Sequence, residues 1–237
     1  VKTDLIKIHD ANPDSCRVIT EYIPYTSPEE LLNLNCQDAS QSVVDNLRDF
    51  HQQGFFLFGF AGSPIDRKGF DLFPQLVKIC AQQFGQVPFK AVWVGCGPGS
   101  IAYQKADRDL RLLGVREHAL LLPSVSCGAA ALRQLDALAL LSREDPYPVV
   151  ALEAGAMAIP TVCFRHSGGI ADLADQGYGV PVDYLDLEAF AAALLSLQRK
   201  PQERGELGRR FQEKVFSSNA VQTQGPQLAQ LILDSAG

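Results

Sequence analysis

One carboxylate, Glu153, lies inside an otherwise apolar stretch that covers residues 149–158. The stretch predicts a helix packed on both sides, because small or apolar residues occupy nearly all of it. Burial of a carboxylate is unfavourable unless the group is paired or hydrogen-bonded. We therefore expect Glu153 to lie near the top of a sheet and to accept hydrogen bonds from hydroxyl groups of a bound molecule. The alternative is a side chain that faces water and has no function.

Asp145 lies eight residues before Glu153, in the polar loop that leads into the same predicted helix. Its carboxylate can also accept hydrogen bonds from hydroxyl groups, although an aspartate here can equally serve as a turn residue or a helix cap. The N–H groups of Val149, Val150 and Ala151 are expected to be free at the helix start, where they can hold a phosphate. The two prolines of the loop provide no N–H group and stiffen it.

A second polar loop, residues 62–68, follows an apolar run and carries two adjacent cations. Arg67 and Lys68 lie where a helix over residues 68–84 is expected to begin, and cations are unfavourable at that end of the helix dipole. We therefore expect an anion close to them, held also by backbone N–H groups of the loop, with Lys68 the better candidate. The alternative is a solvated basic pair with Asp66 as the helix cap.

Two further motifs argue against other enzyme classes. The glycine-rich stretch at residues 95–99 lacks the third glycine and the acidic residue of a dinucleotide fingerprint, so we interpret it as a tight turn. His166 follows an apolar run, but the sequence contains no G-x-S-x-G elbow, which a Ser-His-Asp hydrolase of that type would need. His166 is therefore a loop residue at a ligand-facing end, with or without a functional role.

The elements that position these residues follow from the apolar pattern. Continuous apolar runs predict buried strands, and helical spacing of apolar residues predicts the helices between them. The predicted strands cover residues 17–23, 55–61, 91–95, 119–122, 138–141, 161–164 and 180–182. The predicted helices cover residues 41–52, 68–84, 100–113, 128–135, 149–158, 170–176, 187–198, 202–217 and 227–233.

Alternating helices and fully apolar strands predict an α/β fold, with a doubly wound parallel sheet covered on both faces. We expect residues 1–40 to form an N-terminal lead-in strand and loop, and residues 41–237 to form one Rossmann-like domain with C-terminal helices. Ligands of such folds bind at the carboxyl ends of the strands. The four loops expected at those ends cover residues 62–68, 95–99, 145–149 and 165–169.

The composition of the chain allows a large core and argues against two kinds of partner. Hydrophobic residues make up 46% of the 237 residues, and Lys plus Arg (21) against Asp plus Glu (27) give a net charge of −6. There is no electrostatic case for nucleic-acid binding, so an anionic ligand must be held by local groups. We see neither a signal peptide nor an apolar span of the ~18 residues that a membrane helix needs.

The six cysteines contain no C-x-x-C pair, so a zinc site is not expected. Several of them lie inside apolar runs, which is typical of reduced core thiols, and we predict a cytoplasmic protein. The chain begins at Val1 on a charged stretch, without an initiator methionine. We therefore expect it to be a piece of a longer polypeptide.

Four motifs together resemble the C-terminal, nucleotide-sugar-binding domain of GT-B glycosyltransferases of family 4, from about residue 17 to the end of the chain. They are a basic residue followed by glycine at residues 67–69, a V-G-x-G-P strand end at 92–98, residues 142–153, which are similar to the family's S-x-x-E-x7-E element, and a G-G-I loop at 168–170. In combination these motifs are specific.

The resemblance implies a retaining transfer of a sugar from a nucleoside diphosphate donor, of UDP or GDP type, without a metal or another cofactor. By this resemblance Glu153 holds the ribose hydroxyls, and Lys68 neutralises the leaving diphosphate, where negative charge develops. The loop over residues 145–150 faces the donor sugar. The implied donor-binding residues are Gly62, Ser63, Arg67, Lys68, Asp145, Tyr147, Val149, Val150 and Glu153. The acceptor would bind a missing N-terminal domain, so this piece alone would bind donor but turn over poorly or not at all.

The sequence also departs from the family pattern. Asp145 and Asp172 stand where the family usually has Glu, and Ser63 stands where it often has Arg. Pro146 and Pro148 replace common loop glycines. We interpret these departures as a different donor or geometry. The alternative is a non-catalytic Rossmann-like module that binds a nucleotide or a partner, while the missing fingerprint disfavours a nicotinamide-dependent enzyme.

Overall fold

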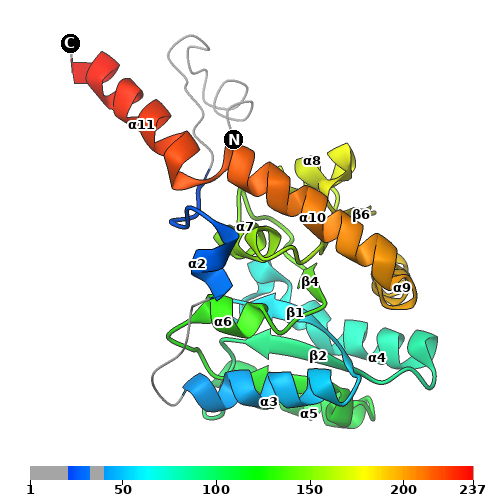
Figure 1. The fold of residues 1–237 in the computed structure, drawn as a ribbon. Coiled ribbons are helices and arrows are strands. Elements are labelled where there is room, and N and C mark those ends of the chain that lie inside the picture. Colours follow the sequence, from blue (N-terminus) through cyan, green and yellow to red (C-terminus); the bar gives the residue numbers. More distant parts are fainter. Residues whose placement is uncertain (1–20, 33–39, 237) are drawn as a thin grey trace.

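The computed structural model describes residues 21–32 and 40–236, which form one sheet of six parallel strands flanked by helices. The strands are β1 (Phe56–Ala61), β2 (Phe89–Val94), β3 (Ala119–Leu122), β4 (Ala137–Leu140), β5 (Thr161–Phe164) and β6 (Val180–Val182). Their order in the sheet is β3-β2-β1-β4-β5-β6 (Figure 1). The predicted parallel α/β fold is confirmed, and each predicted strand from residue 55 onward has its counterpart.

All six strands are parallel, but the order in which the chain adds strands to the sheet reverses between β1 and β4. The chain runs from β1 outward through β2 to β3, then crosses back to pair β4 with β1, and continues outward through β5 to β6. In open parallel sheets, ligands bind in the crevice outside the carboxyl ends of the strands at such a switch point. The loops that follow β1 and β4, which carry Lys68 and Asp145, therefore border the expected binding crevice.

Two layers of helices cover the sheet. The first layer consists of α4 (Phe73–Phe84), which contacts both α5 (Ile101–Leu112) and α9 (Leu187–Arg199). The second layer consists of α3 (Ser40–Gln52), α6 (Gly128–Leu132), α7 (Val149–Ala156), α8 (Gly169–Leu173) and α10 (Pro201–Ser218). The last helix, α11 (Val221–Ala236), extends away from the body of the domain (Figure 1). The sheet is thus doubly wound, as predicted.

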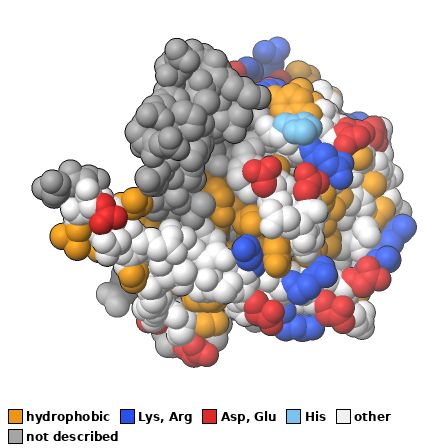
Figure 2. Space-filling model, turned by 90° about the horizontal axis from the view of Figure 1, so that it is seen from above, with side chains coloured by type: hydrophobic (Ala, Val, Ile, Leu, Met, Phe, Trp, Pro, Cys, Tyr) orange, Lys and Arg blue, Asp and Glu red, His pale blue; other side chains and the backbone are white. Residues whose placement is uncertain are grey.

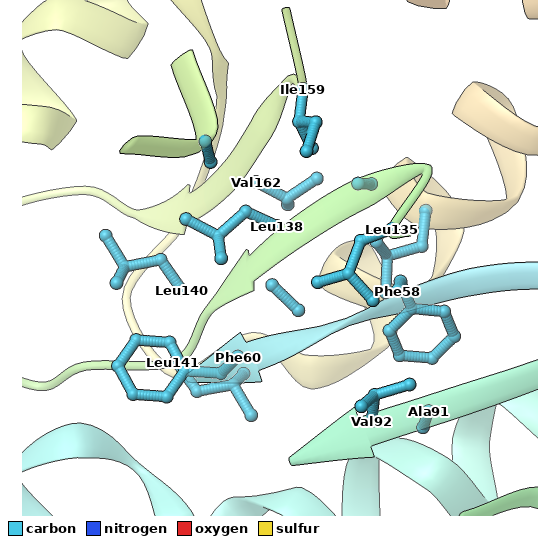
Figure 3. Close-up of a cluster of buried hydrophobic side chains, with 14 of the residues drawn as sticks. Phe58, Phe60, Ala91, Val92, Leu135, Leu138, Leu140, Leu141, Ile159 and Val162 are labelled. Carbon is cyan, nitrogen blue, oxygen red and sulfur yellow. The ribbon is translucent and has the colours of Figure 1, made fainter. Parts of the chain in front are cut away.

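The core is formed by side chains from neighbouring strands, because the strands carry few polar residues. Figure 3 shows Val92 of β2, Leu138 of β4 and Val162 of β5 gathered in one cluster, and all three are fully buried. Burial of each such side chain contributes roughly 1.5–3 kcal/mol. Trp93 of β2 is also fully buried, and its indole N–H donates to the carbonyl oxygen of Gly62 at 3.0 Å. The core therefore fixes the start of the loop that follows β1.

The predicted helix over residues 68–84 is wrong in its first part. Helix α4 begins only at Phe73, after two short 3₁₀ turns that Gly69 separates. The turns are Asp66–Lys68 and Phe70–Leu72. Gly69 has a left-handed φ of 75°, and a Cβ atom there would lie 2.0 Å from the carbonyl oxygen of Leu141, so a helix cannot continue through it. Lys68 therefore does not begin a long helix, and the helix-dipole argument for an anion beside it does not hold.

Other helices also differ from their predicted bounds, and α8 (Gly169–Leu173) ends before the predicted residue 176. Helix α6 ends at Leu132 rather than at residue 135. Helix α7 ends at Ala156 rather than at residue 158, because Ala158 has a left-handed φ of 59° where the chain turns toward β5. Helix α11 begins at Val221, well before the predicted residue 227.

The predicted lead-in lies only partly within the described residues. Residues 1–20 and 33–39, and with them most of the predicted strand over residues 17–23, lie outside the described part of the chain. Ile23 is fully buried and forms a parallel bridge with Ala220, which directly precedes α11. A short helix, α2 (Pro28–Leu32), follows. Ile23 belongs to the same hydrophobic core as the sheet.

The surface of the domain mixes charges of both signs. Figure 2 shows acidic and basic side chains interspersed over the face that it presents. A broad electrostatic field would therefore contribute little to anion binding on this face, and individual side chains must hold an anion. Among the described residues, no helix combines the length and apolar character that crossing a membrane requires.

Candidate functional site

The loops that follow β1 and β4 meet through an ion pair between Lys68 and Asp145, which lie 77 residues apart in the sequence. The Lys68 ammonium donates to Asp145 Oδ2, and the Ser142 hydroxyl donates to the same oxygen at 3.4 Å. The guanidinium of Arg67 lies 3.7 Å from Asp145 Oδ1, and Asp145 is 7% exposed. The anion beside Lys68 in this structure is thus a carboxylate of the protein. Sequence reasoning missed the pair, although both residues follow the ends of what prove to be adjacent strands.

The loop that follows β5 fixes the backbone of Asp145. The N–H group of Asp145 donates to the carbonyl oxygen of Ser167 at 2.7 Å. Gly168 allows this approach, because its φ is 138° and a Cβ atom there would lie 1.8 Å from the carbonyl oxygen of Asp145. The loops after β1, β4 and β5 therefore meet at the carboxyl end of the sheet, as the sequence predicts.

A pocket of about 330 Å³ opens at the carboxyl ends of β1 and β2. Its wall includes Gly62, Ser63, Gly95 and Val125, and α6 begins at its edge. Gly62 and Gly95 bring their backbones together, since a Cβ atom on Gly95 would lie 2.5 Å from the Gly62 carbonyl oxygen. Two of the predicted binding residues, Gly62 and Ser63, thus line a volume suited to a small ligand.

The first turn of α7 presents backbone donors near Asp145. Within the described residues, the N–H groups of Val149 and Val150 make no hydrogen bond, as expected at a helix start. The prediction for Ala151 is wrong, because its N–H group donates to the carbonyl oxygen of Pro148 at 3.0 Å. Val149 is 39% exposed, and α7 has no side-chain cap. Two donors, rather than three, are therefore available to an anion.

Glu153 is half-buried on α7, between the buried residues Leu152 and Ala154. Within residues 21–32 and 40–236, its carboxylate has no hydrogen bond or ion pair. Burial raises the pKa of Glu153, because desolvation disfavours the charged form. Burial raises the pKa of Tyr25 as well, and the negative charge of Glu153 raises it further, so the phenol lies close to this carboxylate. Glu153 is thus a desolvated acceptor that a ligand hydroxyl can satisfy.

Tyr147 has a different environment from the other predicted binding residues. Its hydroxyl accepts a hydrogen bond from Asn219 Nδ2 at 3.4 Å, at the junction of α10 and α11. Burial raises the pKa of Tyr147, whereas the bond from Asn219 acts in the opposite direction. The ring packs on Gly169, where a Cβ atom would lie 2.3 Å from it. The Tyr147 side chain therefore contacts the junction of α10 and α11 through Asn219.

Two further polar residues near the end of β5, His166 and Asp172, are exposed. His166 has a left-handed φ of 64° and lies on the surface, and Asp172 is exposed in the first turn of α8. Neither side chain has a hydrogen bond or ion pair within the described residues.

The described residues contain no group of three or more His, Cys, Asp or Glu side chains that could hold a metal ion. Four cysteines fall within the described part of the chain, and Cys80, Cys96 and Cys163 among them are free thiols. Cys80, Cys96 and Cys163 are buried and Cys127 is half-buried, while Cys16 and Cys36 lie outside the described residues.

The strand order defines a doubly wound, Rossmann-like α/β domain, with charged groups at its switch point. Residues 56–200 match the family Glycosyl transferases group 1, and the chain belongs to this family. Its fold is that of a GT-B glycosyltransferase domain, as the four motifs predict. No curated protein matches the sequence.

Several solved structures share this fold at low sequence identity. HepE from Anabaena in complex with UDP-glucose is 18% identical, with a TM-score of 0.79, over 98% of this chain and 61% of that chain. WaaG, a glycosyltransferase involved in lipopolysaccharide biosynthesis, is 17% identical, with a TM-score of 0.75, over 97% of this chain and 60% of that chain. A glycosyltransferase from Rickettsia africae is 12% identical, with a TM-score of 0.78, over 97% and 60%. This chain thus spans about three fifths of the length of these three proteins.

Proposed function

We propose that this chain is the donor-binding half of a retaining glycosyltransferase, which transfers a sugar from a nucleoside diphosphate sugar to an acceptor. One observation carries the proposal: Lys68 meets the β4–α7 loop at the sheet's switch point, while Glu153 remains unpaired in the described structure on the helix that follows. A cation suited to phosphates and a desolvated carboxylate suited to ribose hydroxyls thus lie on adjacent elements. Membership of the family supports sugar transfer as the reaction.

In this proposal Lys68 acts on the leaving group. The bond between the anomeric carbon of the donor sugar and the diphosphate oxygen breaks, and its electron pair leaves with the diphosphate. The Lys68 ammonium stabilises the negative charge that develops on that oxygen. The N–H groups of Val149 and Val150 bind the same phosphates at the N-terminus of α7. We propose that this positive charge suffices without a metal ion.

Asp145 has two roles in this proposal. Before the donor arrives, its carboxylate holds Lys68 inside the crevice. When the donor binds, the flexible side chain of Lys68 turns toward the diphosphate, and Asp145 faces hydroxyl groups of the donor sugar. Ser63, Arg67 and Gly62 border the phosphate and base from the β1 side.

The solved relatives and the length of the chain support the class of donor and partner. HepE has been solved with UDP and with UDP-glucose. We propose a donor of UDP or GDP type for this chain, and an acceptor site on a further domain of the same polypeptide, because this chain spans about three fifths of the length of HepE and WaaG. A cytoplasmic location stays a prediction.

Isothermal titration calorimetry with UDP, GDP and ADP tests the proposal. We expect at least one of them to bind with a Kd below about 1 mM. Lys68→Ala should weaken that binding by about 10- to 100-fold, because a charge-assisted contact to phosphate is lost. Lys200→Ala is the matched control, since Lys200 lies at the exposed junction of α9 and α10 and pairs with Glu203. Absence of binding by all three nucleotides would contradict the proposal.

The competing function is a non-catalytic module that binds a nucleotide or partner. It is favoured by Ser63 in place of an arginine and by the internal pairing of Lys68. Release of nucleoside diphosphate from a sugar donor by the longer parent protein distinguishes the two. A non-catalytic module releases no nucleoside diphosphate from the sugar donor, even if it binds the nucleotide. A transferase releases the diphosphate, and Lys68→Ala abolishes that release.

A further inference from the structure

Arg143 connects the loop after β4 to the segment after β1. Its guanidinium donates two hydrogen bonds to the carboxylate of Asp71, at 2.7 and 2.8 Å, and a third to the carbonyl oxygen of Asp66 at 2.8 Å. The hydrogen bond to Asp71 raises the pKa of Arg143. A bidentate pair of this kind fixes both the distance and the angle between the groups that it joins.

Further hydrogen bonds continue this connection on the N-terminal side of Lys68. The N–H group of Arg143 donates to the carbonyl oxygen of Arg67 at 2.9 Å. In return, the Arg67 guanidinium donates to the carbonyl oxygen of Glu144 at 2.9 Å. Residues 143 and 144 therefore hold the segment that carries Lys68, through contacts both before and after Lys68 in the sequence.

The ion pair between Lys68 and Asp145 does not fix this geometry by itself. A lysine ammonium on its four-carbon stem acts as a point charge and accepts many orientations. The side chains of Arg143 and Asp71 are 29% and 32% exposed, so their electrostatic attraction alone stabilises the fold little. The distinguishing property of the pair is its planar, two-bond geometry, which sets the position of one loop against the other.

We propose that Arg143 and Asp71 are positioning residues that set the segment carrying Lys68 against the loop that leads into α7. The inference rests on the proposed function of this site and adds the residues that pre-organise it. Arg143 contacts protein groups and acts on the ligand through Lys68. Its contribution is therefore confined to the phosphates and does not extend to the nucleoside.

Calorimetry with a nucleoside diphosphate and its parent nucleoside separates this role from a general effect on folding. The probe pair is UDP with uridine, or the GDP or ADP pair if that diphosphate binds better. We expect Arg143→Ala to raise the Kd of the diphosphate about tenfold and that of the nucleoside less than about twofold. Arg143→Lys, which keeps the charge but loses the bidentate geometry, should rescue only part of the loss. Equal weakening of both probes, or none, would overturn the proposal.

A double-mutant cycle with Lys68 tests whether Arg143 acts through that residue. In the Lys68→Ala background, Arg143→Ala should change the diphosphate Kd by less than about twofold, whereas independent contributions would multiply. Asp71→Asn preserves the shape of the side chain and should weaken diphosphate binding as Arg143→Ala does. It replaces Arg143→Ala in the cycle if that variant folds poorly. Arg111→Ala is the matched control, because Arg111 forms an exposed pair with Asp107 within α5. Multiplying effects of Lys68→Ala and Arg143→Ala would contradict a positioning role.

A crystal structure of Arg143→Ala without nucleotide tests the positioning role independently of the proposed function. We expect the segment that carries Lys68 to shift and the Lys68–Asp145 contact to be lost or divided among conformers. An unchanged contact would overturn the inference, even where the wild-type chain binds nucleotide. A shifted segment in a chain that binds none of the three nucleotides would instead count against the proposed function.

Discussion

Asp136 and Asp145 lie at opposite ends of β4, and their carboxylates are almost equally buried, with side chains 8% and 9% exposed. Each is paired with a cation, since Asp136 Oδ1 lies 3.0 Å from Arg204 and Asp145 contacts Lys68. Burial and pairing alone therefore do not distinguish a functional carboxylate from a structural one in this protein.

The partners of the two aspartates differ in kind. Asp136 Oδ2 accepts the backbone N–H of Leu57 in β1 at 2.9 Å, and Arg204, which reaches Asp136 from α10, also stacks over the ring of Phe56 at 5.4 Å. These groups join the sheet to a helix. Asp145 instead contacts side chains of loops at the carboxyl end, where the strand order reverses. Position on the sheet, rather than the strength of pairing, separates the structural end from the end where we propose that the donor binds.

Two glycines that flank β1 extend the comparison to the backbone. Substitution of one of them, Gly69, has the largest expected effect on stability. Gly54, before β1, and Gly69, after it, have left-handed φ values of 83° and 75°, but a Cβ atom on Gly54 meets nothing within 4 Å. On Gly69 it would lie 2.0 Å from a carbonyl oxygen. We expect Gly69→Ala to lower the free energy of unfolding by about 3 kcal/mol or more and Gly54→Ala by about 1 kcal/mol. Urea unfolding measures both, and equal losses would contradict the close packing at the site.

Removal of each aspartate should lower the free energy of unfolding by a different amount at the two ends of β4. We expect Asp136→Ala to lower the free energy of unfolding by about 3 kcal/mol, because a strand N–H and a partly buried cation lose their acceptor. Asp145→Ala should cost about 1 kcal/mol, since Lys68 can reach solvent. His51→Ala is the control at the first end and should cost less than about 0.5 kcal/mol, as His51 is half-exposed at 3.6 Å from Asp136. A larger loss for Asp145→Ala would reverse the assignment of the two ends.

Glu153 is a third carboxylate, and it has no hydrogen-bond or ion-pair partner among the described residues. The direction in which its ionisation changes the stability of the fold with pH can therefore be stated. Burial raises its pKa in the folded protein, so the native state keeps the proton to higher pH than the unfolded chain does. Its contribution to stability is therefore greatest below the unfolded pKa and falls as pH rises through the native pKa. We expect Glu153→Gln to raise the melting temperature at pH 7 but not at pH 4, and to weaken nucleotide binding about tenfold. A lower melting temperature at pH 7 would mean that Glu153 has a stabilising partner.

The smallest effect compares the charges of the same two aspartates. Asp145→Asn removes a negative charge that competes with phosphate for Lys68, so we expect the preferred nucleoside diphosphate to bind about threefold tighter. Asp136→Asn should leave this Kd unchanged, because Asp136 lies at the other end of the strand. Calorimetry on the two variants measures the difference. Weaker binding by Asp145→Asn would show that the carboxylate assists the diphosphate rather than competing with it.

The sheet could be predicted because the strands are continuous apolar runs of ordinary length. Residues 119–122 and 161–164, for example, have in the structure the bounds that the sequence predicts. The start of α4 could not be predicted in this way. Its apolar spacing is helical from residue 68 onward, and only the contact of Gly69 with the distant Leu141 shows that the helix begins later.

The sequence predicts that the loops of the candidate site share one end of the sheet, but it does not predict which of their side chains pair. Glu153 stood out because one charge interrupts an apolar helix, a signal that lies in local sequence. The pairing of Lys68 with Asp145, and the link from Arg143 to Asp71, join residues more than 70 positions apart. Such contacts depend on which strands become neighbours, and local patterns do not contain that information. The roles of all these residues in donor binding stay predictions.

A crystal structure of the chain with its preferred nucleoside diphosphate tests the central claim most directly. The account predicts phosphate oxygens within hydrogen-bonding distance of Lys68 Nζ, the N–H groups of Val149 and Val150 beside them, and both ribose hydroxyls on Glu153. A nucleotide bound elsewhere, with Lys68 still on Asp145 and Glu153 without a ligand contact, would contradict it.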